Sequence, residues 1–143
     1  MSSDRNICVG NDRLDGIQSI LDGKNSIIQG LEHLCEALKN VRCKKEFEAE
    51  INVVKGIHFI KEGLRMIRNG LCQLHGLIDR ETLKKIKEGI REICCALKEL
   101  CGVLKDICCG RFCEAEEGLV KAIKRIKKGL CKIEKALDDI CVC

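Results

Sequence analysis

Cysteine is the residue type in this chain with the most evident chemistry. The 143 residues include 13 cysteines, about 9 per cent of the sequence, a density typical of chains held by disulfides or by thiolate-bound metal. Thiols can be oxidised to disulfides within one chain or between chains, and thiolates bind soft ions such as Cu(I) and Zn²⁺. Because the count is odd, at least one cysteine lacks a disulfide partner within the chain.

The spacing of the cysteines favours cross-links over a metal site. Cys94–Cys95 and Cys108–Cys109 are vicinal pairs, and neighbouring residues of a helix point to different faces, so each pair is expected to serve two partners. The Cys-x-x-Cys spacing typical of zinc sites and thiol-redox enzymes does not occur in the sequence. Cys109 and Cys113 are four residues apart, and on one helix this pair could offer two thiolates to Cu(I) or Zn. That pair supports an alternative, metal-binding hypothesis.

Other kinds of functional site find little support in the sequence. No nucleophile with a placed base and no phosphate-binding glycine loop occurs, so we expect no enzyme and no cofactor. The chain has no Trp or Tyr, only three Phe and a net charge of +4, so we expect no nucleic-acid partner. The basic segment 121–135 is predicted to be a solvated helix face.

An internal repeat organises the chain. Residues 34–67 recur 66 positions later without gaps, which indicates a tandem duplication. We predict repeat one at about 12–77 and repeat two at about 78–143, both within a single domain, 1–143. The first residues, 1–11, precede the repeats and are predicted to be a flexible N-terminal arm.

The apolar pattern predicts two helices in each repeat. Leu, Ile and Val recur at alternating spacings of three and four, which keeps one face of a helix buried. Asp79 with Thr82 predicts a helix start, and Gly110 predicts a helix stop. The junction Arg42–Phe47 contains neither Gly nor Pro, so a continuous kinked helix stays open there. We therefore predict an all-α fold, an up-down four-helix bundle of two tandem αα-hairpins with heptad-patterned helices.

Heptad positions place the cysteines relative to this bundle. The core positions are almost purely Leu, Ile and Val. Cysteines beside the core can act as small apolar residues, whereas those at other positions are expected at the surface. Position e holds Cys35, Cys94, Cys101, Cys108 and Cys141, positions b and f hold Cys72, Cys95, Cys109 and Cys131, and the termini or turns hold Cys8, Cys43, Cys113 and Cys143.

A column of glycines runs along the predicted helices. Glycine inside a helix costs about 1 kcal/mol relative to alanine, so eight glycines in one heptad column need a compensating interaction. We predict that the column faces another helix, in the same bundle or in a neighbouring molecule, where two backbones approach closely. These close-packing glycines are Gly16, Gly23, Gly30, Gly56, Gly63, Gly70, Gly89 and Gly129.

The compartment that the sequence suggests conflicts with its cysteine content. The start, Met1–Cys8, lacks the basic and apolar regions of a secretory signal, and no run of 18 apolar residues predicts a membrane span. We therefore expect a protein made in a reducing cytoplasm without a signal peptide. Its thiols would stay free during folding and be oxidised later.

The composition, the two vicinal pairs, Cys8 and the closing Cys141-Val-Cys143 together resemble cysteine-rich structural proteins of bacterial spore coats and exosporia. The resemblance implies synthesis and assembly in the mother cell, followed by cross-linking as the surroundings become oxidising. It also implies a final location in the spore coat or exosporium. The implied partners are copies of the chain, as a homopolymer, and other cysteine-rich coat proteins.

The sequence thus predicts a self-assembling structural protein that forms a disulfide-cross-linked layer or fibre. The alternative is a cytosolic bundle that stores Cu(I) or Zn on thiolates, with Cys109 and Cys113 as its metal ligands. The candidates for intermolecular disulfides are Cys8, Cys72, Cys94, Cys95, Cys108, Cys109, Cys113, Cys131, Cys141 and Cys143.

Overall fold

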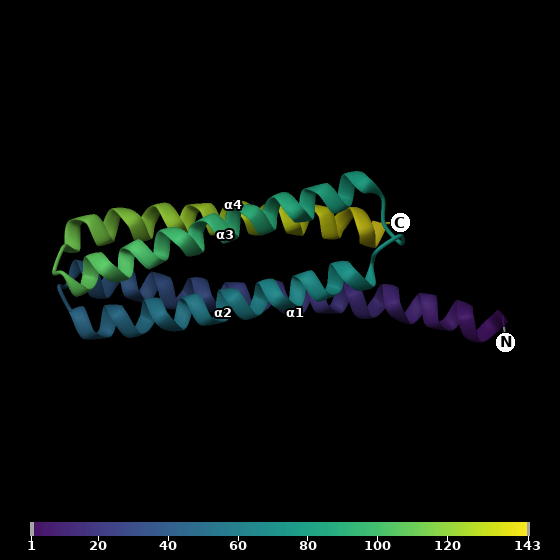
Figure 1. Cartoon of the computed structure of the whole chain (residues 1–143), viewed down its shortest axis with the longest axis horizontal. Coiled ribbons are helices and arrows are strands. Elements are labelled where there is room, and N and C mark those ends of the chain that lie inside the picture. The colour runs from purple at the N-terminus through teal and green to yellow at the C-terminus, as the bar shows by residue number, and fades with distance from the viewer. Residues whose placement is uncertain (1, 143) are drawn as a thin grey trace.

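The chain folds into four α-helices and, among the residues described, no strand. The computed structural model describes the backbone of residues 2–142 and the side chains of residues 13–140. The helices are α1 (Ser2–Arg42), α2 (Glu46–Gln73), α3 (Arg80–Cys108) and α4 (Phe112–Val142). Helices α1 and α2 form one antiparallel hairpin, α3 and α4 form the other, and the hairpins lie side by side (Figure 1). The predicted all-α bundle of two tandem hairpins is confirmed.

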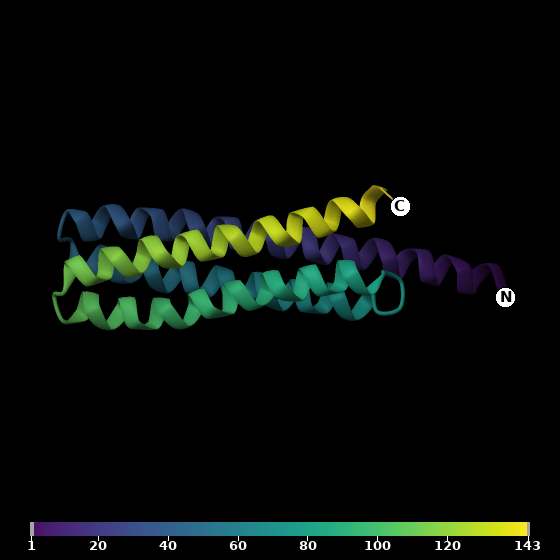
Figure 2. The ribbon, with the colours of Figure 1, turned by 90° about the horizontal axis from the view of Figure 1, so that it is seen from above.

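Helix α1 is longer than its three partners and continues past the end of the bundle (Figure 2). The flexible arm predicted for residues 1–11 stays a prediction, because the side chains of that segment lie outside the described part. Across the described residues, no helix combines the length and apolar character that a membrane crossing requires.

The core is a continuous column of aliphatic side chains supplied by all four helices. The largest fully buried residues are all Ile or Leu: Ile20, Ile27, Leu34, Ile60, Ile67, Leu74, Ile86, Ile93, Leu100, Ile107, Leu119 and Ile126. Each such side chain contributes about 1.5–3 kcal/mol by leaving water. No described cysteine belongs to this buried core, and of the ten described cysteines only Cys94 packs against it from the side.

One residue that breaks the apolar pattern is Lys24, and the structure explains it. Lys24 lies on α1 where α1 meets α4, with its ammonium 3.3 Å from a carboxylate oxygen of Glu134. The Lys24 side chain is 25% exposed, so the charged end stays partly in water while the aliphatic stem covers the core edge. The break in the pattern thus marks a contact between the two hairpins.

The two turns at one end of the bundle have the same geometry. Lys44 and Gly110 are 66 residues apart, and both have positive φ, 58° and 73°. In each turn, the amide of the next residue donates to the carbonyl five positions back, as in Lys45 to Asn40 at 2.8 Å and Arg111 to Asp106 at 2.7 Å. This is the Schellman pattern of a helix end. The stop predicted at Gly110 is confirmed, and the first junction is a true turn, not a kinked helix.

The turn at the other end begins helix α3 as the sequence predicts. The Asp79 carboxylate accepts a hydrogen bond from the Thr82 backbone amide at 2.8 Å, the arrangement of an N-cap. The side chain of Thr82 and its backbone amide both lower the pKa of Asp79, because hydrogen bonding from Thr82 favours the ionised carboxylate.

The glycine column forms the seam within each hairpin. Gly16 faces Gly70, Gly23 faces Gly63 and Gly30 faces Gly56 across α1 and α2, and Gly89 faces Gly129 across α3 and α4. A Cβ added at Gly63 would lie 2.5 Å from the Gly23 carbonyl oxygen, and one at Gly129 would lie 2.6 Å from that of Gly89. The column therefore lies inside the molecule, and its members allow backbones to touch.

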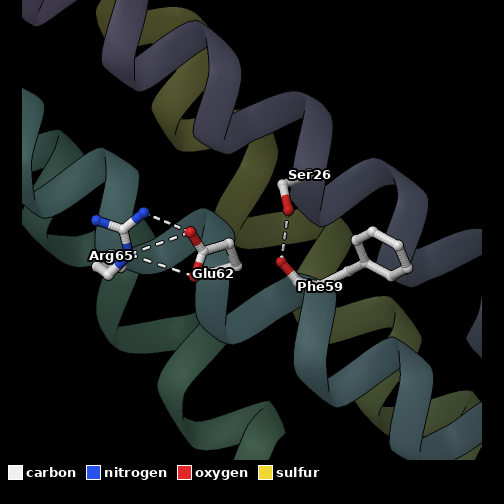
Figure 3. Close-up of polar contacts among 4 residues, drawn as sticks. All are labelled: Ser26, Phe59, Glu62 and Arg65. Atoms are coloured by element: carbon white, nitrogen blue, oxygen red, sulfur yellow. Dashed lines mark hydrogen bonds and ion pairs between the residues drawn. The ribbon is translucent and has the colours of Figure 1, made fainter.

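A buried hydroxyl adds a polar tie at the α1–α2 seam. Ser26 is only 9% exposed, and its hydroxyl donates a hydrogen bond to the Phe59 carbonyl at 2.8 Å (Figure 3). Glu62, on the same helix as Phe59, accepts a hydrogen bond from the guanidinium of Arg65 at the surface (Figure 3). The seam thus satisfies its buried polar group while the charged groups stay in water.

Candidate cross-linking surface

The thiols lie at the surface of the bundle. Among the ten cysteines whose side chains are described, none is buried, eight are exposed, and Cys94 and Cys95 are partly covered. None of these ten is in a disulfide. The eight exposed cysteines are Cys35, Cys43, Cys72, Cys101, Cys108, Cys109, Cys113 and Cys131. For the position-e cysteines, the possibility of a small apolar residue beside the core applies to the partly covered Cys94, whereas Cys35, Cys101 and Cys108 are exposed.

The terminal candidates Cys8, Cys141 and Cys143 lie outside the described side chains. Their role in cross-linking stays a prediction. The candidate cross-linking surface consists of the ten cysteines whose side chains are described.

One row of thiols follows α3 along its boundary with α2. Cys94, Cys101 and Cys108 are seven residues apart, so they lie on one helix face. Cys94 accepts a hydrogen bond from the Arg68 guanidinium, with Nη2 3.2 Å from Sγ. Cys108 donates to the Glu50 carboxylate, with Sγ 3.4 Å from Oε1.

The contact with Glu50 makes the thiol of Cys108 harder to ionise. The hydrogen bond to Glu50, partial desolvation and the negative charge of Glu50 together raise the pKa of Cys108. Since the thiolate is the form that reacts in disulfide chemistry, Cys108 is expected to react more slowly than the other two thiols of the row.

The other repeat carries a different contact at the position of Cys108. Arg42 and Glu116, which link α1 to α4 by an ion pair at 2.8 Å, occupy the positions equivalent to Cys108 and Glu50. The same bundle position thus carries an ion pair on one side of the molecule and a thiol–carboxylate contact on the other. A cysteine at this position is consequently not a requirement of the fold.

Several thiols gather at the end of the bundle that carries the two Schellman turns. Cys43 lies in the first turn, and Cys109 and Cys113 lie on either side of the second (Figure 1). All three are exposed. Cys72, by contrast, is in the last turn of α2 at the opposite end.

The metal-binding alternative loses its geometric premise here. It assumed that Cys109 and Cys113 share one helix, but the chain reverses at Gly110 between them, with Cys109 capping α3 and Cys113 in α4. Within the described residues, no three Cys, His, Asp or Glu side chains gather closely enough to hold a metal ion. Two of the histidines contact the ring of Phe59: His33 is stacked on it at 5.3 Å between ring centroids, and His58 meets it edge-on at 6.0 Å.

The sequence reasoning missed one surface feature, an apolar row on α2. Phe47, Ile51 and Val54 are 70%, 37% and 51% exposed. The signal was present in the repeat, because the equivalent α4 positions hold Cys113 and Glu117 in place of Phe47 and Ile51.

Comparisons with known proteins do not assign the chain to a family. No protein-family model matches it. Searches against curated proteins and against solved structures likewise return no significant match.

Proposed function

We propose that this protein is a self-assembling structural protein whose surface thiols join copies of the chain by disulfides. The observation that supports the proposal most strongly is the distribution of thiols: none of the ten described cysteines is buried, eight are exposed, and the buried core consists of aliphatic side chains. Exposed thiols are a liability in a protein that does not use them. Thiols that reach solvent on a rigid body are suited to reacting with another molecule.

The distribution over the surface favours a polymer over a simple pair. Each helix carries at least one accessible thiol, for example Cys35 on α1, Cys72 on α2, Cys95 on α3 and Cys131 on α4. A body with reactive groups on several sides can link to more than two neighbours. Contacts between unlike surfaces then propagate as a layer or fibre instead of closing.

The covalent step needs an oxidant from outside the chain. Two thiols on neighbouring copies form one S–S bond, and they release two protons and two electrons to dioxygen or a small-molecule disulfide. Geometry restricts the reaction, because Cα atoms must lie about 4.4–6.8 Å apart. Copies must therefore be aligned by non-covalent contacts before they are linked cleanly.

The resemblance to spore-surface proteins extends the proposal to a place and to partners. In that setting the chain would be made in the reducing mother cell and linked later in the coat or exosporium, with other cysteine-rich coat proteins as further partners. This order would keep the thiols free during folding.

The proposal is tested by oxidising the purified reduced protein and following covalent size on gels without reductant. Wild-type protein is expected to form a ladder that collapses to monomer when reductant is added. A variant with all thirteen cysteines replaced by serine should keep its helical circular dichroism and give no ladder. A wild-type protein that stays monomeric after complete oxidation, with its thiols consumed in internal disulfides, would contradict the proposal.

The same preparation tests the metal-storage alternative. Reduced protein is titrated with Cu(I), and bound metal is counted after dialysis against a competing chelator. Tight uptake of many Cu(I) ions per chain without oxidative laddering would favour storage. Weak, chelator-sensitive binding is the result that the separated Cys109 and Cys113 thiols lead us to expect.

A further inference from the structure

The apolar row of Phe47, Ile51 and Val54 leaves a large part of each side chain in contact with solvent. The three side chains are spaced by four and three residues on α2, so they lie on one face of the helix, and all three are exposed. A contiguous apolar patch on a small protein indicates a contact surface. This row is therefore a candidate for the non-covalent contact that aligns copies.

The duplicated half provides an internal control for this interpretation. Helix α4 occupies the same place in its own hairpin, yet it has Cys113 and Glu117 where α2 has Phe47 and Ile51. A polar residue is thus compatible with the bundle at the Ile51 position. Val54 has the apolar counterpart Val120, so the two halves differ at Phe47 and Ile51, and Cys113 and Glu117 on α4 show that the bundle does not require large apolar side chains at those two positions.

We propose that α2 pairs face to face with α2 of a second copy, antiparallel and about a two-fold axis that passes beside Ile51. This inference deepens the proposed function and rests on it, because such pairing is a way to align copies before oxidation. A shared patch of this kind makes an isologous contact, the commonest interface in homo-oligomers.

The arrangement of side chains around Ile51 fits that symmetry. Successive residues are about 100° apart around a helix, so Phe47 and Val54 lie about 40° and 60° to one side of Ile51. Glu48 and Lys55 lie about 60° and 40° to the other side. When two antiparallel helices face each other across a two-fold axis, the apolar side of one helix lies against the apolar side of the other. The charged side of one helix likewise lies against the charged side of the other.

The heights along the helix complete the match. Phe47 lies about 6 Å before Ile51 and Val54 about 4.5 Å after it, so Phe47 of one copy meets Val54 of the other. By the same argument Glu48 of one copy meets Lys55 of the other. Both charged residues are exposed, so each dimer gains two complementary charge contacts beside an apolar centre.

Self-pairing of α4 by the same rule would fail. It would place Glu117 of one copy against Glu117 of the other at the two-fold axis, where like charges repel. It would also replace the Phe47 contact with the smaller Cys113. The α4 face keeps the equivalent charge pair, Glu114 and Lys121, and Val120 in place of Val54, so the two faces differ at Phe47 and Ile51, where α2 alone places an apolar residue at the two-fold axis.

The contact is small, so the pairing is expected to be reversible. Three partly exposed side chains per copy cover well under the roughly 800 Å² per partner of a standard stable interface. The dimer should consequently dissociate on dilution and depend on each apolar side chain.

The test is sedimentation of the reduced full-length protein over a concentration series. The wild type is expected to pass from monomer to dimer as concentration rises. The variant I51E should weaken dimerisation at least tenfold. It is expected to fold, because a glutamate, Glu117, already occupies the equivalent position on α4. The matched control is L14E, which adds the same charge at a residue that is 66% exposed on α1 and should dimerise like the wild type.

A charge exchange tests the antiparallel alignment. The variant K55E should weaken the dimer severalfold by facing Glu48, and the double variant with E48K and K55E should restore it. Helical circular dichroism is checked for every variant.

Three results would overturn the inference: a reduced wild type that is monomeric throughout, an I51E dimer as strong as the wild type, or growth beyond dimer in reductant. Growth of that kind would indicate a head-to-tail contact on another face. Failure of the proposed function is a separate result, since it would show as no covalent ladder after oxidation of a protein that still dimerises when reduced.

Discussion

Replacing Gly63 by alanine tests the close contact of α1 and α2 most sharply. The added Cβ would lie 2.5 Å from the Gly23 carbonyl oxygen and 2.6 Å from Ile27 Cγ1, whereas ordinary contacts are about 3.5–4 Å. The two helices must therefore separate by about 1 Å at this level. The clash with a backbone carbonyl is expected to cost about 3 kcal/mol, the upper part of the range for overpacking.

The intrinsic helix preference works in the opposite direction, so a control is needed. Alanine stabilises a helix by about 1 kcal/mol relative to glycine, which leaves G63A a net loss of about 2 kcal/mol. Gly102 on α3 is an exposed helical glycine whose added Cβ would meet nothing within 4 Å, so G102A should gain about 1 kcal/mol.

The assay is urea unfolding of reduced protein followed by circular dichroism, with the unfolding free energy obtained by linear extrapolation. The free energy of unfolding of G63A should lie about 2 kcal/mol below that of the wild type, and that of G102A about 1 kcal/mol above it. The two variants should therefore differ from each other by about 3 kcal/mol. A G63A protein as stable as G102A would show that α1 and α2 do not touch at this glycine, and would refute the reasoning.

Three further predictions concern the turns and the thiol row. In the Schellman turns, K44G should stabilise the protein by about 1 kcal/mol and G110A should destabilise it by a similar amount, as seen in urea unfolding, because left-handed backbone penalises any side chain; a loss of stability in K44G would contradict the shared turn geometry. Cys108 should react with iodoacetamide more slowly than in the E50Q variant near pH 8, as measured by mass spectrometry of the labelled peptide, because the contact with Glu50 raises the thiol pKa; equal rates would mean that the contact does not form in solution. The Asp79 cap should contribute stability that is present above its unfolded pKa of about 3.9 and is lost as pH falls through its lower folded pKa, so the stability difference between wild type and D79S should shift against the wild type in acid; a difference constant with pH would contradict the cap.

The architecture was predictable because local and global signals agree. The alternation of three and four among Leu, Ile and Val determines which faces are buried, and Asp79 and Gly110 carry recognisable end signals. The turn at Lys44 was the exception. Its backbone adopts the left-handed conformation that Gly110 adopts in the second repeat, and residue type alone does not show this because lysine is unusual there.

The cysteine surface was predictable only in part. Heptad letters predicted exposure for Cys72 and Cys131 correctly. They left the position-e cysteines open, because a position beside the core is covered only as far as the neighbouring helix reaches across it, and the structure leaves Cys101 and Cys108 exposed and Cys94 partly covered. Contacts such as that between Cys108 and Glu50 depend on how two hairpins pack, which the pattern of one helix does not encode.

The apolar row on α2 was missed for a related reason. A heptad pattern predicts which residues are buried, and it gives no information on apolar residues outside the pattern. Phe47 is such a residue, at the start of α2. The repeat carried the information, since a difference between two copies in the same structural setting points to a role beyond the fold.

The central claim, that surface thiols join copies of a rigid bundle, is tested most directly by mapping the disulfides of the oxidised protein. Equal amounts of ¹⁴N- and ¹⁵N-labelled protein are mixed while reduced, oxidised together, digested without reductant and examined by mass spectrometry. The account predicts disulfide-linked peptides that contain one light and one heavy partner, from cysteines on the exposed surface. Linked peptides in which both partners always carry the same label would show that the disulfides form within single chains and would contradict the account.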